Sequence, residues 1–550
     1  MLKPLLQIHP ADNILVCLRS LTAGELVEIR DGQLQILEDI PAKHKCAARD
    51  FTTGELLIMY GLVVGKTLRP IAQGCKISTK NVTHHTGDYQ LKTKASNWKG
   101  PSTQAYQGQT FMGYHRADGR VGTRNYWLVV PLVFCENRNI QVIREAMEEK
   151  LGYASERDFS IEVETLIQLY QNGATTEELQ KANILRERQD IQRQQLFPNV
   201  DGIRFLQHEG GCGGIRQDAE SLCRLLAGYI THPNVAGATV LSLGCQNAQI
   251  TLLQDAIQAL QPKFTKPLYI LEQQQSKSER TFIANAVKQT FIGLMTANRC
   301  QRQAADLSHL CLGLECGGSD GFSGITANPA LGYTTDLLIA LGAKAILAEF
   351  PELNGVEQAL IHRCRSRESA EKFVALMRTY ARRAQEAGSG FDQNPSPGNI
   401  KDGLITDAMK SAGAARKGGS SPVVAVLDYT EPATEPGLNL LCTPGNDVES
   451  TTGLAGSGAN LIVFTTGLGT PTGNPICPTI KMSSNTELAQ RMSDLIDIDA
   501  GTIISGQDSI ESKGEELLKL LIRIASGEVH TQAERLGQYD FIPWKRGISL

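Results

Sequence analysis

A strand, a glycine-rich loop and a helix start follow one another between residues 310 and 332, which read LCLGLECGGSDGFSGITANPALG. Alternating apolar residues open the stretch, as in a short β-strand, and Gly317, Gly318, Gly321 and Gly324 predict a tight loop. Asn328-Pro329 then favours a helix N-terminus, because Asn caps free backbone amides and Pro suits the first turn. An α/β protein uses this order to present polar groups and amide dipoles to a small anion.

The loop carries a dense set of groups that donate hydrogen bonds or bind metals, namely Cys316, Ser319, Asp320, Ser323, Thr326 and Asn328. The alternative is a glycine-rich turn around a buried thiol, since glycine motifs alone are weak signals.

The chain has 550 residues, which is too long for one core and predicts two to four domains. Residues 1–90 read as a small β-rich domain, with a hairpin across Arg30-Asp31-Gly32. Residues 91–110 are polar and irregular, which predicts a linker in which Trp98 and Tyr106 anchor on a neighbouring domain.

From residue 111 onward, apolar strands alternate with helical segments, which indicates parallel sheets covered by helices. We predict one α/β domain over 111–305 and a second over 306–550, with a solvated helical excursion at about 152–199. Ligands bind at the carboxyl edge of such sheets. Four cysteines each follow a predicted strand end, so we expect them to approach one another there: Cys135, Cys212, Cys245 and Cys316.

Charge and hydropathy argue against some classes of binding partner. A formal net charge of −4 argues against general binding to nucleic acids or membrane surfaces. No stretch approaches the ~20 apolar residues that span a bilayer, and no signal peptide is recognisable, so we expect a cytoplasmic protein. Thirteen cysteines without a CxxC pair indicate reduced thiols.

The chain contains no GxSxG elbow, HExxH helix or GxxxxGK[ST] phosphate loop. What remains is a set of cysteines and histidines with carboxylates, lysines and asparagines on glycine loops. Thiolates bind soft or borderline metals, and lysines and asparagines donate to hydroxylated carboxylates. The residues alone therefore predict metal-assisted chemistry on a small polar acid.

Long motifs sharpen this prediction. The segments GYHRADGRVGTRN, HEGGCGG, LSLGCQN, AEFPELNGVEQ, NPSPGNIKDGL, TPGNDVESTTG and FTTGLGTPTGNPICPTIK, with the stretch at 310–332, resemble the altronate dehydratase family over nearly the whole chain. HPADN and AKHKCAA resemble the small β-clip module, the SAF domain, that precedes the catalytic part in that family. The helical excursion at about 152–199 departs from the shorter members of the family.

The resemblance implies removal of water from D-altronate in hexuronate catabolism, giving 2-dehydro-3-deoxy-D-gluconate, with Fe²⁺ or a substitute such as Mn²⁺. Our hypothesis places proton transfer on His208, Asp320 and Lys401. Substrate contacts are expected from Arg124, Asn125, Ser319, Asn328, Asn399 and Lys481. Metal ligands are expected among Cys135, Cys212, Cys245, Cys316, His9 and His44. A homo-oligomer is also expected.

Several alternatives stay open. The substrate could be galactarate or sulfolactate, since those enzymes resemble the same blocks. The chain could also bind a sugar acid without turning it over. Four thiolates could hold an iron–sulfur cluster in place of one ion, or the cysteines could be small buried core residues.

Overall fold

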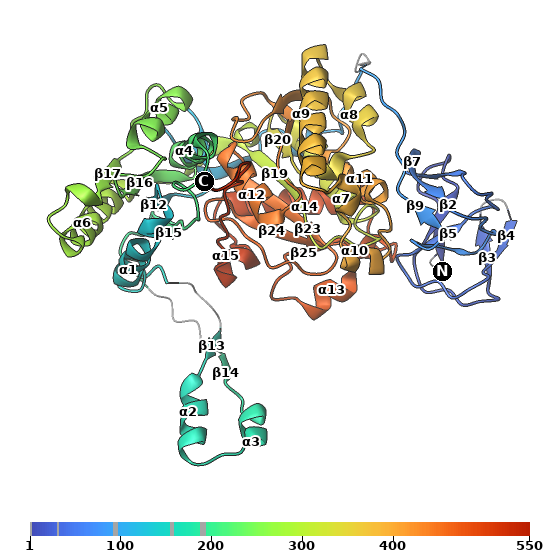
Figure 1. Cartoon of the computed structure of the whole chain (residues 1–550), viewed down its shortest axis with the longest axis horizontal. Coiled ribbons are helices and arrows are strands. Elements are labelled where there is room, and N and C mark those ends of the chain that lie inside the picture. The colour runs from blue at the N-terminus through green and yellow to red at the C-terminus, as the bar shows by residue number, and fades with distance from the viewer. Residues whose placement is uncertain (1–2, 30–31, 92–96, 155–158, 188–193) are drawn as a thin grey trace.

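The computed structural model describes residues 3–29, 32–91, 97–154, 159–187 and 194–550. Figure 1 shows a small β unit at one end, a larger central α/β unit and a second α/β unit at the other end. Among the described residues, no helix is both long enough and apolar enough to cross a membrane.

The N-terminal unit consists of short antiparallel sheets. One has the order β1-β2-β5-β8, a second pairs β3 with β4, and a third has the order β6-β7-β9. The strands are β1 Leu5–Leu6, β2 Ile14–Cys17, β3 Leu26–Ile29, β4 Gly32–Gln35, β5 Lys45–Ala47, β6 Leu56–Met59, β7 Leu62–Thr67, β8 Lys76–Ile77 and β9 Val82–Thr83. The β3–β4 pair confirms the expected hairpin strands, while Arg30 and Asp31 lie outside the described residues.

The segment that follows runs along the C-terminal unit. Trp98 Nε1 donates to Ser420 Oγ at 3.1 Å, and Tyr106 is buried in the core of the C-terminal unit. The anchoring of both aromatic residues is therefore confirmed.

The next unit is built on a parallel sheet of order β15-β12-β16-β17. Because β12 is apolar at every position, alternate side chains fill two cores, with Leu128 facing α4 and α5 and Trp127 facing α1 and α6. The elements are β12 Tyr126–Pro131, α1 Asn137–Met147, β15 Gly202–Phe205, α4 Arg216–Thr231, β16 Val235–Ser242, α5 Ile250–Leu260, β17 Leu268–Glu272 and α6 Glu279–Ala297. An antiparallel sheet of β10 Thr110–His115, β11 Val121–Gly122 and β18 Gln303–Asp306 closes the unit.

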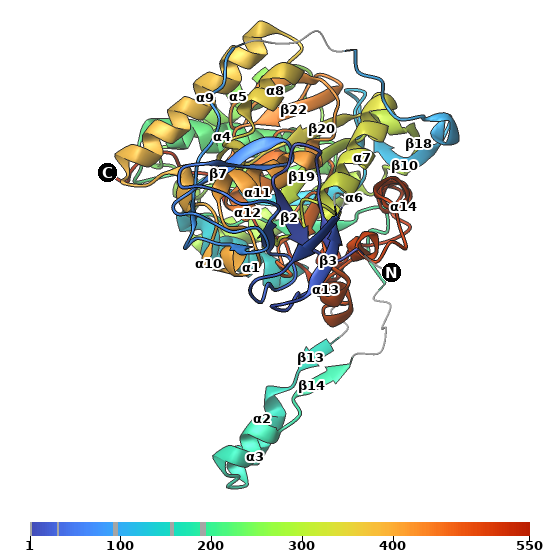
Figure 2. The same cartoon turned by 90° about the vertical axis from the view of Figure 1, so that its right-hand side faces the viewer.

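An arm projects from this unit, as both views show (Figures 1 and 2). It contains β13 Phe159–Ile161, α2 Val163–Gln171, α3 Thr176–Lys181 and β14 Leu185–Glu187. Neither helix has a buried residue, which confirms the predicted solvated helical excursion over 163–181. Tyr153 and Phe197 at its ends are buried, and residues 155–158 and 188–193 lie outside the described residues. The antiparallel β13–β14 pair at its base was not predicted.

The C-terminal unit is organised by a seven-stranded parallel sheet of order β21-β22-β20-β19-β23-β24-β25. The strands are β19 Cys311–Cys316, β20 Lys344–Leu347, β21 Val423–Leu427, β22 Gly437–Leu441, β23 Leu461–Thr466, β24 Thr479–Ser483 and β25 Ile498–Asp499. The helices are α7 Ala327–Ala340, α8 Glu357–Arg363, α9 Arg367–Glu386, α10 Pro397–Lys401, α11 Asp407–Ala414, α12 Asp447–Gly456, α13 Thr486–Arg491, α14 Ile510–Ala525 and α15 Gln532–Leu536. The predicted fold class, a β-rich N-terminal domain followed by two α/β units with mostly parallel sheets, is confirmed.

Candidate active site

The strand order of the large sheet reverses beside β19. Successive strands β20 and β22 lie on one side of β19, whereas β23, β24 and β25 lie on the other. Ligands of open α/β sheets bind outside the carboxyl ends of the strands at such a reversal. Cys316 is the last residue of β19 and pairs in register with Thr465 of β23, so it lies at this point.

The glycine loop after Cys316 is held by one carboxylate. Asp320 Oδ1 accepts from the amides of Phe322 and Ser323 at 3.1 and 2.9 Å, and from Ser484 Oγ at 2.8 Å. Gly317 allows the loop to approach Asp447, because a Cβ at Gly317 would lie 2.0 Å from Asp447 Oδ2. Helix α7 follows, which confirms a helix after the loop, but it begins at Ala327 with Thr326 as the N-cap residue, so the predicted capping by Asn328 is wrong.

Acidic residues from two neighbouring strand ends surround Cys316. The ligand atoms of Cys316, Glu349 and Glu352 all lie within 4.8 Å of one another, as do those of Glu315, Glu349 and Asp447. Glu349 and Glu352 follow β20, and Asp447 opens α12 after β22. All the strands are parallel, which is why these loops meet at one edge.

Two lysines partly neutralise this acidic cluster. Lys417 Nζ lies 2.7 Å from Cys316 Sγ and 2.8 Å from Glu349 Oε2. Lys410 Nζ donates to Glu352 Oε1 and to Asn394 Oδ1, both at 2.6 Å. The carboxylates of Glu315, Glu349, Glu352 and Asp447 thus outnumber the two ion-paired ammonium groups.

Burial controls protonation in the cluster. Desolvation, reinforced by neighbouring carboxylates, raises the pKa of Glu315 and Glu349 above the ordinary range and raises that of Asp447 to about 7. Burial also raises the pKa of the Cys316 thiol, although Lys417 opposes it. For Lys417, burial favours the neutral amine, but Cys316 and Glu349 outweigh it and raise its pKa. Burial therefore favours the protonated form of several carboxyl groups in the cluster.

A cavity of about 580 Å³ opens onto this cluster. Its lining includes Cys316, Asn394, Ser396, Asn399, Lys410 and Asp447. Amide, hydroxyl and ammonium donors are the groups that recognise hydroxyls and carboxylates, so the cavity suits a small sugar acid.

The donor set fits a divalent cation. Glu315 Oε1 and Glu349 Oε1 are buried and have no hydrogen-bond partner within the described part of the chain. Buried polar atoms without partners are costly, and a cation between the thiol and the carboxylates would satisfy them. A site that combines a thiolate with carboxylate oxygens suits a divalent first-row metal of borderline softness.

Several predicted residues lie in the C-terminal unit and form contacts within the protein. Asp320 forms an ion pair with Lys43 at 2.9 Å, and Asn328 Oδ1 accepts from Thr465 Oγ1 at 2.7 Å. Asn399 Nδ2 donates to the backbone oxygen of Ser319 at 2.8 Å, and only Asn399 of these lines the cavity. Lys401 is exposed at the end of α10.

Lys481 is buried in β24 behind the cluster. Its Nζ has no hydrogen-bond partner among the described residues and lies 3.5 Å from the centroid of the Phe464 ring. Burial lowers its pKa to about 7.

The prediction that four cysteines share one rim needs correction. Cys135, Cys212 and Cys245 follow β12, β15 and β16 of the four-stranded sheet, whereas Cys316 ends a strand of the seven-stranded sheet. Strand ends share an edge only within one sheet, and the sequence does not reveal that the chain builds two.

His208 lies with the cysteines of the four-stranded sheet. Its Nε2 lies 2.7 Å from the Pro131 oxygen, and Nδ1 accepts from the Gly210 amide at 3.1 Å. Burial lowers its pKa to about 4. It lines a separate cavity of about 710 Å³ together with Cys212 and Asp218. The structure thus does not bring this histidine to Cys316.

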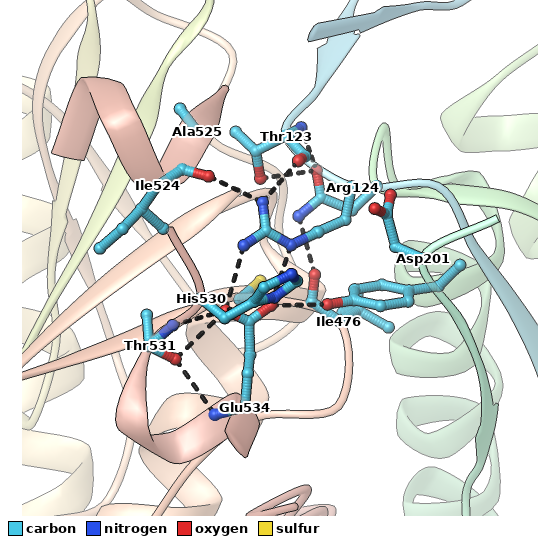
Figure 3. A network of polar contacts seen from close by, with 12 residues as sticks. Thr123, Arg124, Asp201, Ile476, Ile524, Ala525, His530, Thr531 and Glu534 are labelled. Carbon is cyan, nitrogen blue, oxygen red and sulfur yellow. Dashed lines mark hydrogen bonds and ion pairs between the residues drawn. The ribbon is translucent and has the colours of Figure 1, made fainter. Parts of the chain in front are cut away.

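Arg124 joins two units of the chain, whereas Asn125 joins segments of one unit. The Arg124 guanidinium faces the Glu534 carboxylate (Figure 3), with Nε at 2.9 Å from Oε1. The Asn125 amide group donates to the backbone oxygens of Asn199 and Ala297 at 2.7 and 3.1 Å. Neither side chain lines the cavity at Cys316.

The two predicted histidines of the N-terminal unit do not join the cluster. His9 is exposed and accepts from the Ala11 amide at 3.2 Å. His44 is buried and its Nδ1 lies 3.2 Å from the Ala42 oxygen. It is the neighbouring lysines that reach the C-terminal unit, since Lys43 pairs with Asp320 and Lys45 Nζ donates to the Gly403 oxygen at 2.6 Å.

The site residues that the sequence analysis did not assign are Glu315, Glu349, Glu352, Lys410, Lys417 and Asp447. Glu349 and Asp447 each follow a strand of the predicted parallel sheet, so the argument applied to the cysteines could have found them. Lys410 and Lys417 come from α11 and the short helix Ala415–Gly418, where no local pattern marks them.

Known families match all three units of the chain. The family described as D-galactarate/Altronate dehydratase, C-terminal, matches residues 307–549, and D-galactarate dehydratase/Altronate hydrolase, second domain, matches 113–298. The Altronate/galactarate dehydratase SAF domain matches 3–85.

Curated relatives match end to end. An altronate dehydratase of Bacillus subtilis is 32% identical over 549 residues, covering 100% of both chains, and one of Escherichia coli is 32% identical over 545 residues, covering 99% of each. The L-threo-forming galactarate dehydratase of Escherichia coli is 32% identical over 97% of this chain and 95% of its own. This chain belongs to the altronate/galactarate dehydratase family, with its SAF domain, second domain and C-terminal domain.

Proposed function

We propose that this chain is an altronate dehydratase, which removes water from D-altronate to give 2-dehydro-3-deoxy-D-gluconate in hexuronate catabolism. The observation that carries the proposal is the cavity at Cys316, where acidic residues, donor side chains and a thiol meet at the strand-order reversal. The end-to-end match to altronate dehydratases supports this substrate.

The proposed cofactor is Fe²⁺, with Mn²⁺ as a substitute, held by Cys316, Glu349 and Glu352. A bound divalent ion supplies Lewis-acid stabilisation of negative charge on the substrate carboxylate, an effect of several kcal/mol. Metal binding requires the thiol to lose its proton, and Lys417 at 2.7 Å favours the thiolate.

The chain's own residues handle the proton and the orientation of the substrate. Asp447 lines the cavity with a pKa of about 7, which is suited to removing the weakly acidic proton from carbon 2 near neutrality. Lys410 offers its ammonium group to the substrate carboxylate, and Asn394 and Asn399 offer amides to its hydroxyls. Asp447 then returns this proton to the departing hydroxyl on carbon 3, which leaves as water.

An anaerobic assay tests the proposal. The purified chain is supplied with Fe²⁺ and, in parallel, D-altronate, galactarate and sulfolactate, and the 2-keto product or released sulfite is measured. We expect turnover with D-altronate and a loss of at least about 100-fold in Asp447→Asn. Turnover of another acid in preference to D-altronate, or binding of D-altronate without turnover, would contradict the assignment.

We further propose that the protein is cytoplasmic and forms a homo-oligomer.

A further inference from the structure

Three of the thirteen cysteines are exposed, and these three lie at the same edge of one sheet. They are Cys135, Cys212 and Cys245, while the other ten are buried or half-buried. They follow β12, β15 and β16, which are neighbours in the order β15-β12-β16-β17. All pairs in this sheet are parallel, so the three thiols leave it at the same edge.

Backbone hydrogen bonds join the three cysteine loops. The Phe134 amide donates to the Gly210 oxygen at 3.1 Å, and the Ala248 amide donates to the Gly211 oxygen at 3.0 Å. Gly211 has a φ of +99°, and a Cβ there would lie 2.1 Å from the Leu132 oxygen. The loop of Cys212 is thus pressed against the loops of Cys135 and Cys245.

The surroundings of the three thiols offer hydrogen-bond donors. Helices α1, α4 and α5 begin directly after the three cysteine loops, and helix N-termini present free backbone amides. Gln274, which follows the fourth strand β17, directs Nε2 to Cys245 Sγ at 3.4 Å. Amide donors to sulfur are typical of metal–thiolate sites.

The spacing argues against one shared ion. Among the described residues, the three thiols do not form a group whose ligand atoms all lie within 4.8 Å of one another. Sulfur ligands of one tetrahedral ion bond at about 2.3 Å and are therefore less than about 4 Å apart. In a four-iron, four-sulfide cluster each thiolate binds a different iron, so the sulfur ligands lie farther apart than around one ion.

We propose that Cys135, Cys212 and Cys245 bind an iron–sulfur cluster at the carboxyl edge of the four-stranded sheet. On binding of a preassembled cluster, each thiol releases its proton to solvent and its sulfur bonds one iron. Three thiolates leave the fourth iron of a four-iron cluster without a cysteine ligand. The 710 Å³ cavity that Cys212 lines provides space beside the site. This site is separate from Cys316 and does not depend on the proposed function.

Anaerobic reconstitution of the full chain with equal ferrous and ferric iron and inorganic sulfide tests the site. Iron, acid-labile sulfide and visible absorption are measured for the unchanged chain, the three single Cys→Ser variants and the triple variant. Cys75→Ser, a half-buried thiol in the N-terminal unit, is the matched control, and Cys316→Ser reports on the other site. Circular dichroism verifies that each variant is folded.

The unchanged chain, Cys75→Ser and Cys316→Ser are expected to hold about four sulfides per chain, with about four cluster irons in addition to any single ion bound at Cys316. The triple variant is expected to lose the sulfide, the cluster irons and the visible absorption, while the ion at Cys316 remains. Equal cluster content in the triple variant, or iron bound without sulfide in the unchanged chain, would overturn the inference. The measurement is cluster content. A loss of D-altronate turnover in Cys316→Ser would therefore count against the proposed function and not against the cluster site.

Discussion

Glu349 combines an unusual backbone conformation with a central place in the acidic cluster. Its φ of 64° and ψ of 61° lie in the left-handed region, which costs a residue other than glycine about 1–3 kcal/mol. Thr443 holds the turn, since its Oγ1 accepts from the Glu349 amide at 2.8 Å. The conformation directs the carboxylate toward Cys316 and Lys417, so strain here accompanies the assembly of the site.

We expect Glu349→Gln to weaken Fe²⁺ or Mn²⁺ binding at least about 10-fold and to lower kcat at least about 100-fold. The substitution removes a charged ligand while preserving shape. Metal titration of the apoprotein and steady-state kinetics measure the two effects. Glu357→Gln, a buried glutamate of α8, is the control and should leave both quantities unchanged. Unchanged metal affinity in Glu349→Gln would remove Glu349 from the ligand set.

Lys481 should reduce stability in a pH-dependent way. Its folded pKa of about 7 lies below the unfolded value of about 10.4, so the unfolded state binds more protons between these limits. The destabilisation that Lys481 causes is largest below pH 7 and decreases as the pH approaches 10. We expect Lys481→Met to stabilise the chain by about 1–3 kcal/mol at pH 7, and by less at pH 10.

Urea unfolding at pH 7 and pH 10 measures this difference. Lys401→Met removes an exposed lysine and should change the free energy of unfolding little at either pH. A gain of equal size at both pH values would show that the Lys481 pKa is not depressed.

At the scale of elements, the strand, glycine loop and helix at 310–332 could be predicted from sequence because every cue is local. Apolar alternation marks β19 and glycines mark the loop, whereas Asn328-Pro329 indicates the helix α7 but places its start two residues too late. The cysteine arrangement could be predicted only in part. Each cysteine does follow a strand, yet the division into two sheets depends on pairings between strands far apart in the sequence.

The charged partners in the site could not be predicted for the same reason. Lys417 meets Cys316 across 101 positions of the chain, and Ser450 meets Glu315 across 135. Their positions depend on how whole helices pack on the sheet. No periodicity or spacing in the sequence encodes such contacts.

The Lys43 loop is one of the contacts that dock the N-terminal unit, and β7 supplies another, since Thr406 Oγ1 donates to the Val64 oxygen at 2.6 Å. Lys43 has a φ of 73°, and its backbone oxygen would lie 2.2 Å from a Cβ at Gly321. We therefore expect Gly321→Ala to force the Lys43 loop away, at a cost of about 1–3 kcal/mol, and to speed proteolysis of the segment after residue 83. Gly87→Ala meets no atom within 4 Å and is the control. Equal cleavage rates in the two variants would show that the loop does not depend on this close contact.

At the scale of the molecule, a buried ion pair joins the two α/β units (Figure 3). Arg124 precedes β12, and Glu534 lies in α15. Burial alone would raise the pKa of Glu534, but Arg124 outweighs burial and holds it well below the usual range. The pair therefore stabilises the fold at neutral pH, and this contribution falls as the pH drops below about 4.3.

Glu534→Gln should lower the free energy of unfolding by about 3–5 kcal/mol at pH 7, because it leaves Arg124 buried without its counter-charge. The difference from the unchanged chain should shrink as the pH falls below 4. Urea unfolding across this range provides the measurement. Glu528→Gln, which removes an exposed pair with Arg523, should have little effect. A constant difference at every pH would show that the carboxylate charge contributes nothing.

The arm at 159–187 shares none of these constraints. Neither of its helices contributes a buried side chain, and its strand pair projects away from both α/β units (Figures 1 and 2). Side chains along this segment therefore meet few packing constraints within the chain, and insertions or deletions there are expected to be tolerated. The same freedom makes it a natural graft point, where a fluorescent reporter or an affinity handle can be inserted far from the catalytic groups.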